Sequence, residues 1–345
     1  MKGAPTYLIR TAGPGDFEVF KQLRALAGPG FTSLMVDDAG LKARLEKAAH
    51  SFAADVSAPG DERYLLVMDE IGGQAGAGCV GVKACVGESP PFFNFRVLKI
   101  AQASAAAQRR FDLDVLILVN EFAGCSEVGS LFVRAEHRAH GVGRLLAQSR
   151  YLMMAAAPHR FAEKIVSELR GMVSPEGRSP FWEHLGRHFF RMSFQEADLL
   201  SATTDNQFIL DLMPKYPIYA DLLPEEARAA IGEAHEDGRA ARRLLEWEGF
   251  RYDGVVDIFD GGPLLSVSRD AIRTLRETRR MPLRAGAVGP GARRALIATP
   301  AIAAFRCAPA LARLENGEAV ADPATLTALG LEDGADALIW MGDAV

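Results

Sequence analysis

The chain's most informative stretch is Arg138-Ala139-His140-Gly141-Val142-Gly143. An apolar run, residues 128–133, precedes it, and residues 142–157 follow with apolar side chains at helical spacing. The order predicts a strand, a tight glycine turn and a helix. Two glycines let a backbone approach a phosphate closely, and the amides at a helix N-terminus attract anions. Arg138 and Arg144 flank the turn and could pair with phosphate oxygens, or they could be ordinary surface arginines.

An Arg-x-x-Gly-x-Gly turn between a strand and a helix resembles the pyrophosphate-binding loop of GCN5-related acyl-CoA N-acyltransferases. A dinucleotide-binding loop with the pattern Gly-x-Gly-x-x-Gly is a rival interpretation, although Leu146 stands where its third glycine would be. The third interpretation of the turn is an ordinary strand-to-helix connection. Short glycine motifs match by chance too often for the turn alone to separate these interpretations.

Composition narrows the class of protein. Half of the 345 residues are hydrophobic, which is enough for a sizeable core. The formal net charge of −5 argues against nucleic acid as a partner, because such surfaces normally carry a basic excess. The four cysteines form no Cys-x-x-Cys pair, and no apolar run reaches the roughly 18 residues that span a membrane. We therefore expect a soluble, cytoplasmic protein without a membrane partner.

The order of predicted elements indicates an α+β fold. We expect the segment 88–96 to be an aromatic-rich loop, and the basic segment 273–293 to be a linker or exposed loop. The other elements are strands at 7–10, 64–69, 78–86, 115–119, 127–133, 164–169 and 249–259, and helices at 17–27, 38–52, 142–157, 180–190, 211–219, 224–234 and 239–248.

The C-terminal segment 290–345 is expected to form a small β-rich, barrel-like module. Short apolar strands are predicted at 294–299, 302–308 and 337–340, with a helix and turn at 325–334 that resemble part of a small double-psi barrel. Such a module is too short for a large core of its own. It should therefore pack on the main domain or on a partner, with a structural or assembly role.

Several longer segments are similar to one family, the arginine N-succinyltransferases. The similarity is dense from about residue 31 to residue 263 and thin after residue 280. The segments that carry it are 125–133, 167–171, 177–190, 211–219, 248–252 and 257–263.

The resemblance implies an enzyme that transfers the succinyl group of succinyl-CoA to the α-amine of L-arginine in arginine degradation. Succinyl-CoA is then a co-substrate, and no tightly bound cofactor is expected. The implied organisation is a GCN5-related N-acyltransferase domain over residues 1–275, with a helical insertion over about 195–248, and the module at 290–345. A homo-oligomer, or a hetero-oligomer with a paralogous subunit, is expected.

The alternative function is a non-catalytic or ornithine-preferring subunit of a hetero-oligomeric succinyltransferase. Some family members work as paired paralogues that also accept L-ornithine. This chain departs from the family pattern after His235 and in the segment before Gly124. A third possibility is a generic acetyltransferase that acts on another amine.

The resemblance also implies site residues. The family's acyl-CoA contact falls on Leu131, and its proposed proton donor aligns with His235. Backbone amides near Leu131 would hold the thioester oxyanion. An imidazole can move a proton near neutral pH, although a solvated histidine in a turn is the plainer interpretation of His235. The full set of predicted acyl-CoA-binding residues is Leu131, Phe132, Val133, Arg138, His140, Gly141, Val142, Gly143 and Arg144.

A guanidinium substrate needs a carboxylate with bidentate geometry. The candidates are Glu127, Glu168, Asp257 and Asp260, and each could instead serve as a fold-internal ion pair or turn cap. No metal is expected, because aminolysis of a thioester needs none and the histidine spacings lack the His-Glu-x-x-His order.

Overall fold

The computed structural model describes residues 6–27, 36–138, 141–204 and 206–342. The chain forms two compact units. Strand β6 (Ser126–Val133) starts in the second unit and continues in the first. Over the part of the chain that is described, no helix is long and apolar enough to cross a membrane. The first unit comprises Met1–Ala84, Val128–Glu163 and Ser268–Val345, and the second comprises Cys85–Glu127 and Lys164–Val267.

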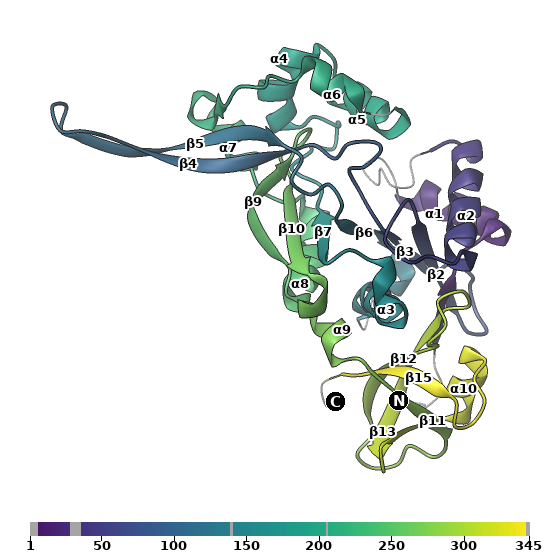
Figure 1. The fold of residues 1–345 in the computed structure, drawn as a ribbon. Helices are drawn as coiled ribbons and strands as arrows, with labels where there is room; N and C mark the ends of the chain where they lie inside the picture. Colours follow the sequence, from purple (N-terminus) through teal and green to yellow (C-terminus); the bar gives the residue numbers. More distant parts are fainter. Residues whose placement is uncertain (1–5, 28–35, 139–140, 205, 343–345) are drawn as a thin grey trace. The chain divides into compact units, whose positions relative to one another are not determined.

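The first unit holds a sheet with helices packed against it (Figure 1). Strands β1, β2 and β3 are antiparallel neighbours, and β6 lies beside β3. Helices α1 and α2 bury Phe20 and Leu41 against Val67 of β2, because their apolar residues recur three or four apart and form one face. The predicted elements of this region are confirmed. Their bounds are β1 Tyr7–Thr11, α1 Phe17–Ala27, α2 Asp38–Ala53, β2 Arg63–Glu70, β3 Gly78–Lys83 and α3 Val142–Ala156.

A closed barrel completes the first unit and confirms the expected β-rich C-terminal module. Its strands pair in the order β12, β15, β11, β14, β13, and β13 pairs back with β12. Alanines such as Ala308 and Ala319 fill much of the interior, so the strands can close tightly. The elements are α9 Arg273–Glu277, β11 Arg279–Ala285, β12 Arg293–Ala298, β13 Arg306–Glu315, β14 Glu318–Ala321, α10 Pro323–Leu329 and β15 Asp336–Met341.

The expected linker over residues 273–293 is wrong. Much of it forms α9 and β11, and β11 pairs with β14 on one side and β15 on the other. The arginines of β11 are exposed and only Leu283 is fully buried, so the segment lacks the alternation typical of a strand. The segment is a strand because the barrel closes by pairing it with β14 and β15, which lie farther along the chain.

The second unit is built on strands in the order β7, β10, β9, β4, β5, β8. Its main core surrounds the fully buried indole of Trp182, whose ring lies 5.2 Å from that of Phe190 and 5.6 Å from that of Phe259. The elements are β4 Asn94–Ser104, β5 Arg109–Val119, β7 Lys164–Glu168, a π-helical turn Trp182–Gly186, α4 Arg187–Phe190, α5 Phe194–Thr203, α6 Gln207–Leu212, β8 Ile218–Tyr219, α7 Glu225–Ala230, α8 Arg239–Glu248, β9 Arg251–Asp257 and β10 Pro263–Ser268.

The hairpin of β4 and β5 was largely missed by the sequence prediction. The predicted loop at 88–96 runs into β4, which already begins at Asn94, and the predicted strand at 115–119 is only the last part of β5. The two strands stay in register from the pair Asn94 and Val119 to the pair Ser104 and Arg109. Most of residues 98–112 are exposed and include many charged, alanine and polar residues, so no buried pattern indicated a strand.

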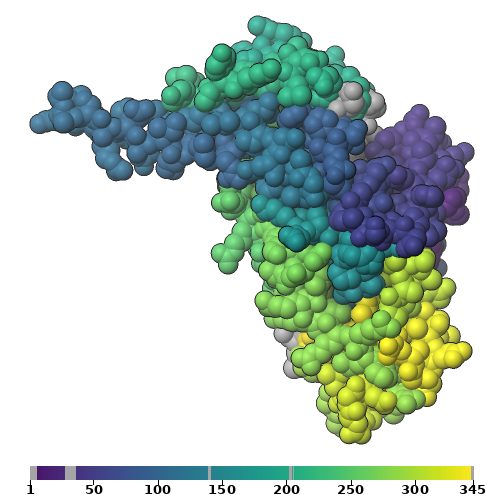
Figure 2. Space-filling model, in the orientation of Figure 1, coloured from purple at the N-terminus to yellow at the C-terminus, as the bar shows by residue number. Residues whose placement is uncertain are grey.

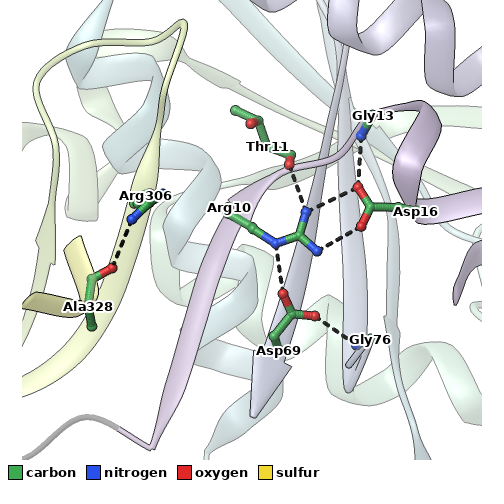
Figure 3. Close-up of polar contacts among 8 residues, drawn as sticks. All are labelled: Arg10, Thr11, Gly13, Asp16, Asp69, Gly76, Arg306 and Ala328. Carbon is green, nitrogen blue, oxygen red and sulfur yellow. Dashed lines mark hydrogen bonds and ion pairs between the residues drawn. The ribbon is translucent and has the colours of Figure 1, made fainter. Parts of the chain in front are cut away.

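Arg10 of β1 joins three segments of the first unit through two carboxylates (Figure 3). Its Nη2 donates to Oδ1 of Asp16 at 2.7 Å, and its Nε donates to Oδ2 of Asp69 at 2.8 Å. Each carboxylate also accepts a backbone amide, Asp16 from Gly13 at 2.9 Å and Asp69 from Gly76 at 2.8 Å. The neighbouring carboxylates raise the pKa of the guanidinium, so the cation is retained.

We expect Arg10→Ala to lower the free energy of unfolding by about 2–4 kcal/mol, because it leaves a buried carboxylate without its cation. The Asp16 side chain is only 10% exposed. Urea unfolding measures the loss. The control is Lys47→Ala, whose partner Asp61 is 73% exposed, and this change should cost less than about 1 kcal/mol. Equal losses in the two variants would contradict the prediction.

Candidate functional site

Strand β6 carries a backbone irregularity just before the predicted acyl-CoA contact. Ser130 has a φ of +54°, a left-handed conformation that is uncommon for a residue with a side chain. Such conformations are concentrated at functional sites. The residues that follow are the half-buried Leu131 and the buried Phe132 and Val133. The predicted site on β6 therefore begins where the backbone departs from regular strand geometry.

Helix α3 begins with an exposed N-terminus. Gly141 is its N-cap residue, with a φ of +81°, and no described side chain caps the helix there. A Cβ atom on Gly141 or on Gly143 would have no heavy atom of the described residues within 4 Å. Uncapped amides beside open space suit an anion. Of the predicted loop residues, His140 lies outside the described residues, as does Ala139.

The two arginines that flank the turn have different surroundings. Nε of Arg138 donates to the carbonyl oxygen of Val133 at 2.8 Å, and its guanidinium lies 5.7 Å from the centre of the Phe132 ring. This exposed arginine is therefore held at the end of β6, next to the turn. The guanidinium of Arg144 lies 5.8 Å from the centre of the Trp340 ring in β15. The barrel thus contacts the first turn of α3.

His235 lies between α7 and α8 in the second unit. Its backbone amide donates to the carbonyl oxygen of Arg170 at 2.8 Å, and that of Gly232 donates to Gly261 at 2.8 Å. Nδ1 of His235 accepts the amide of Asp237 at 3.3 Å. The same nitrogen lies 3.5 Å from Oδ2 of Asp237, which would pair with a protonated ring. The side chain is 23% exposed.

Three of the four predicted carboxylates, Glu168, Asp257 and Asp260, lie together in the second unit. Burial raises the pKa of Asp257 to about 8, and the charge of Glu168 is the next cause. Burial also raises the pKa of Asp260 well above its usual value, with the charge of Asp257 as the second cause. Neighbouring carboxyl groups in a desolvated place cannot all ionise, so this cluster keeps protons near neutral pH.

Asp260 holds the turn between β9 and β10 against the chain that follows β7. Its Oδ1 accepts the amide of Gly262 at 2.8 Å, and its Oδ2 accepts the amide of Gly171 at 2.7 Å. A Cβ on Gly171 would lie 2.5 Å from the carbonyl oxygen of Asp260, and one on Gly262 would lie 2.2 Å from that of Leu169. Both glycines are therefore required by close packing of backbone on backbone.

Asp257 uses its carboxylate differently. A single oxygen, Oδ1, accepts the amides of Phe259 and Asp260, at 2.7 and 2.8 Å. The fourth candidate, Glu127, lies on β6 in parallel register with Val166 of β7. The structure therefore groups Glu168 with Asp257 and gives Asp260 a clear role in the fold.

Asp257→Asn should gain stability relative to the unchanged protein as the pH rises from about 5 to about 8. Folded Asp257 holds its proton up to a pH of about 8, whereas an unfolded aspartate loses it near 3.9. The stabilisation from the neutral carboxyl is therefore complete below pH 4 or so and is lost as the pH rises to about 8. Asparagine keeps an Oδ1 acceptor and never ionises.

Urea unfolding across this pH range measures the difference. The control is Asp253→Asn on the same strand, where the side chain is 86% exposed. The control should show no trend, and a flat difference for Asp257→Asn would contradict the assigned protonation.

Two other histidines, His137 and His184, have polar side-chain partners, and the four cysteines are buried. Nδ1 of His137 lies 3.1 Å from the hydroxyl of Tyr7, and Nε2 of His184 lies 2.5 Å from Oε1 of Glu226. All four cysteines are buried and form no disulfide, and burial raises the pKa of Cys125. In the segments that the structure describes, no group of three or more His, Cys, Asp or Glu side chains could hold a metal ion.

Sequence reasoning missed Ser130, Gly171 and Gly262. Serine is not specially suited to a positive φ, so Ser130 carried no signal. Gly262 stands in the Asp-Gly-Gly segment 260–262, which indicated a turn but not its partner at Gly171. The role of Gly171 depends on a segment about ninety residues away, which no local pattern reveals.

Comparison with known proteins finds similarity over nearly the whole chain. A family model described as arginine N-succinyltransferase beta subunit matches residues 7–274. The chain is 38% identical over 328 residues to arginine N-succinyltransferase subunit beta of Pseudomonas aeruginosa, covering 95% of this chain and 96% of that protein. It is 39% identical over 329 residues to an arginine N-succinyltransferase of Salmonella paratyphi B, covering 95% of each.

A solved structure is similar as well. Arginine/ornithine succinyltransferase subunit AI from Pseudomonas aeruginosa matches with a TM-score of 0.87 and 30% sequence identity. The match covers 98% of this chain and 100% of the other. The fold class predicted from the sequence is thereby confirmed.

Proposed function

This chain belongs to the arginine N-succinyltransferase family, and we propose that it transfers the succinyl group of succinyl-CoA to the α-amine of L-arginine. The products are N2-succinyl-L-arginine and free CoA. One observation carries the proposal: the family similarity over residues 7–274 includes both the β6–α3 segment and the segment of His235. The open, uncapped N-terminus of α3 supports it, because CoA carries a pyrophosphate.

The proposed reaction is attack of a neutral amine on a thioester. An α-amino group has a reference pKa of about 8 in peptides, and the α-amine of the substrate must give up its proton before it attacks. Its lone pair forms the C–N bond, the carbonyl becomes an oxyanion, and the nitrogen gives up one proton to solvent. The oxyanion then re-forms the carbonyl as the C–S bond breaks and releases the CoA thiolate. We assign the backbone amides near Leu131, Phe132 and Val133 to the oxyanion, and the amides of Val142, Gly143 and Arg144 with the Arg138 guanidinium to the pyrophosphate.

We assign His235 the transfer of a proton to the leaving thiolate. A CoA thiolate has a pKa near that of cysteine, about 8.5, so a proton donor assists its departure. The donor in this step is the protonated ring, which carries a proton on each nitrogen: Nδ1 lies 3.5 Å from Oδ2 of Asp237, and Nε2 is the atom that would donate. The backbone bond to Arg170 holds this segment in place and does not depend on the imidazole.

We place the guanidinium of L-arginine at Glu168 and Asp257. A guanidinium prefers two carboxylate oxygens in one plane, and a cation there would displace the shared proton of this pair. Both oxygens of Asp260 already accept backbone amides, so it serves the fold rather than the substrate. Glu127 becomes the favoured residue if Glu168→Gln and Asp257→Asn leave the KM for arginine unchanged.

The test is release of CoA by the purified chain alone, with each combination of acyl donor and amine. We expect release that requires both succinyl-CoA and L-arginine. Release with L-ornithine alone would indicate the ornithine-preferring subunit, and no release without a second subunit would indicate the non-catalytic role. A preference for acetyl-CoA would indicate a generic acetyltransferase. Each of these three results would overturn the proposal.

The proposed setting is the cytoplasm, because four free thiols are typical of a reducing compartment. We further propose that residues 1–275 form the catalytic domain and that the barrel, which includes β11 as well as the module expected at residues 290–345, supports it, in line with the contact between Trp340 and Arg144. The relative from Pseudomonas aeruginosa is named as a subunit, which supports an oligomeric enzyme.

A further inference from the structure

The outer part of the β4–β5 hairpin, residues 98–114, is an amphipathic ribbon that we call the arm. Its register places Ile100 opposite Leu113 and Gln102 opposite Phe111. Residues directly opposite each other on antiparallel strands point to the same side. Leu98, two residues before Ile100, shares that side, so one face of the arm is largely apolar.

The apolar face of the arm is exposed. The ribbon extends away from the helices and other strands of its unit (Figures 1 and 2). Leu98 is 40% exposed and Phe111 is 52% exposed. A two-stranded ribbon is at best marginally stable in water by itself, and neighbouring exposed apolar side chains mark sites of association. The arm is therefore expected to associate with another strand or surface.

The outer edge of β5 is available for pairing beyond a definite residue. At the base of the hairpin, β8 pairs with Val115 and Leu116. The amide of Asp114 donates to Oδ2 of Asp221 at 2.9 Å, so it points away from β4 and is already used. Alternate residues of an antiparallel strand direct their amides to the same edge, so Asp112 and Arg110 also face outward.

The charges along this edge indicate which kind of strand would pair with it. Residues 109–114 read Arg-Arg-Phe-Asp-Leu-Asp, with positive charge before Phe111 and negative charge after it. An antiparallel strand of the same sequence is complementary to this pattern, because its negative half meets the positive half. The side chains of Arg110 and Asp112 reach each other only at 3.9 Å, and Arg110 is 73% exposed.

We propose that the arm pairs with the arm of a second copy of this chain, with β5 antiparallel to β5 about a two-fold axis at Phe111. Arg110 then lies opposite the partner's Asp112 on both sides of the axis, and Phe111 lies against the partner's Phe111. An axis at Asp112 would set that carboxylate against its own copy and would need the Asp114 amide, which Asp221 occupies. Homodimers commonly have such a self-complementary interface.

Sedimentation velocity of the purified chain over a range of concentrations tests the proposal. The unchanged chain should dimerise, and Phe111→Glu or Arg110→Asp should weaken self-association at least about tenfold. The double variant Arg110→Asp with Asp112→Arg restores opposite charges across the axis and should recover the dimer. Leu314→Glu, a strand residue of the barrel that is 50% exposed, is the matched control and should have no effect.

Disulfide trapping tests the register separately. The two-fold axis puts a Cys at position 111 opposite its own copy, so Phe111→Cys should form a cross-linked dimer when diamide oxidises the two thiols. Leu113→Cys should not, because its copies are displaced along the strands beyond the reach of a disulfide. The four native thiols are buried and contribute little background.

Four outcomes would overturn the proposal: a monomer at every concentration, a dimer that survives both single substitutions, failure of the charge swap to recover the dimer, or cross-linking at position 113 but not at 111. A monomer that associates only with a paralogous subunit would reassign the arm to that subunit. No residue of the arm is assigned a part in the reaction, so turnover per chain remains a separate test of the proposed function.

Discussion

His235→Ala should lower kcat by about 10²–10⁴-fold and leave the KM for L-arginine nearly unchanged. The imidazole is assigned a proton transfer to the departing thiolate, and such an interaction acts in the transition state rather than in substrate binding. The substitution keeps the backbone amide that bonds to Arg170, so the segment should stay in place. Steady-state rates of CoA release, with each substrate varied in turn, measure the effect.

The matched control for this prediction is His184→Ala. His184 belongs to the same unit, and its ring contacts Glu226 through Nε2. We expect that variant to keep nearly full activity. A loss of less than about threefold for His235→Ala would return His235 to the role of a solvated turn residue.

Gly143→Val should weaken the binding of CoA about 100-fold or more, a loss of about 2.7 kcal/mol. The position has no heavy atom of the described residues within 4 Å of an added Cβ, so the free protein should accept the side chain. The same space is where a pyrophosphate would approach the first amides of α3. Gly141→Val should also abolish binding. Its φ of +81° would strain a valine backbone, so the loss could not be attributed to the pyrophosphate contact alone.

Calorimetric titration with CoA measures this affinity, and thermal unfolding shows whether the variant is folded. Gly15→Val is the matched control, because an added Cβ at Gly15 also meets nothing within 4 Å and the residue lies in a different turn. Equal affinity of Gly143→Val, Gly15→Val and the unchanged protein would remove the glycine turn from the CoA site.

The candidate site was predictable from the sequence to the extent that its signals are local. A strand, two glycines and a helical pattern occur in one continuous segment, and the structure has β6, the positive φ of Gly141 and α3 there. The sequence supplied the four candidate carboxylates but did not show which of them serve the fold and which could bind a substrate. Only the folded chain shows that Asp260 accepts amides from Gly171 and Gly262, and that Asp257 shares its surroundings with Glu168.

The sequence alone determined the elements whose apolar residues follow one period, such as α1 and α2, because one buried face is encoded by neighbouring residues. Tertiary structure decided β11 and most of the β4–β5 hairpin. Few side chains of these strands are buried, and their backbone groups are paired by partners elsewhere in the fold. The protonation of Asp257 was decided in the same way, because the burial and the second carboxylate that raise its pKa come from segments brought together only on folding.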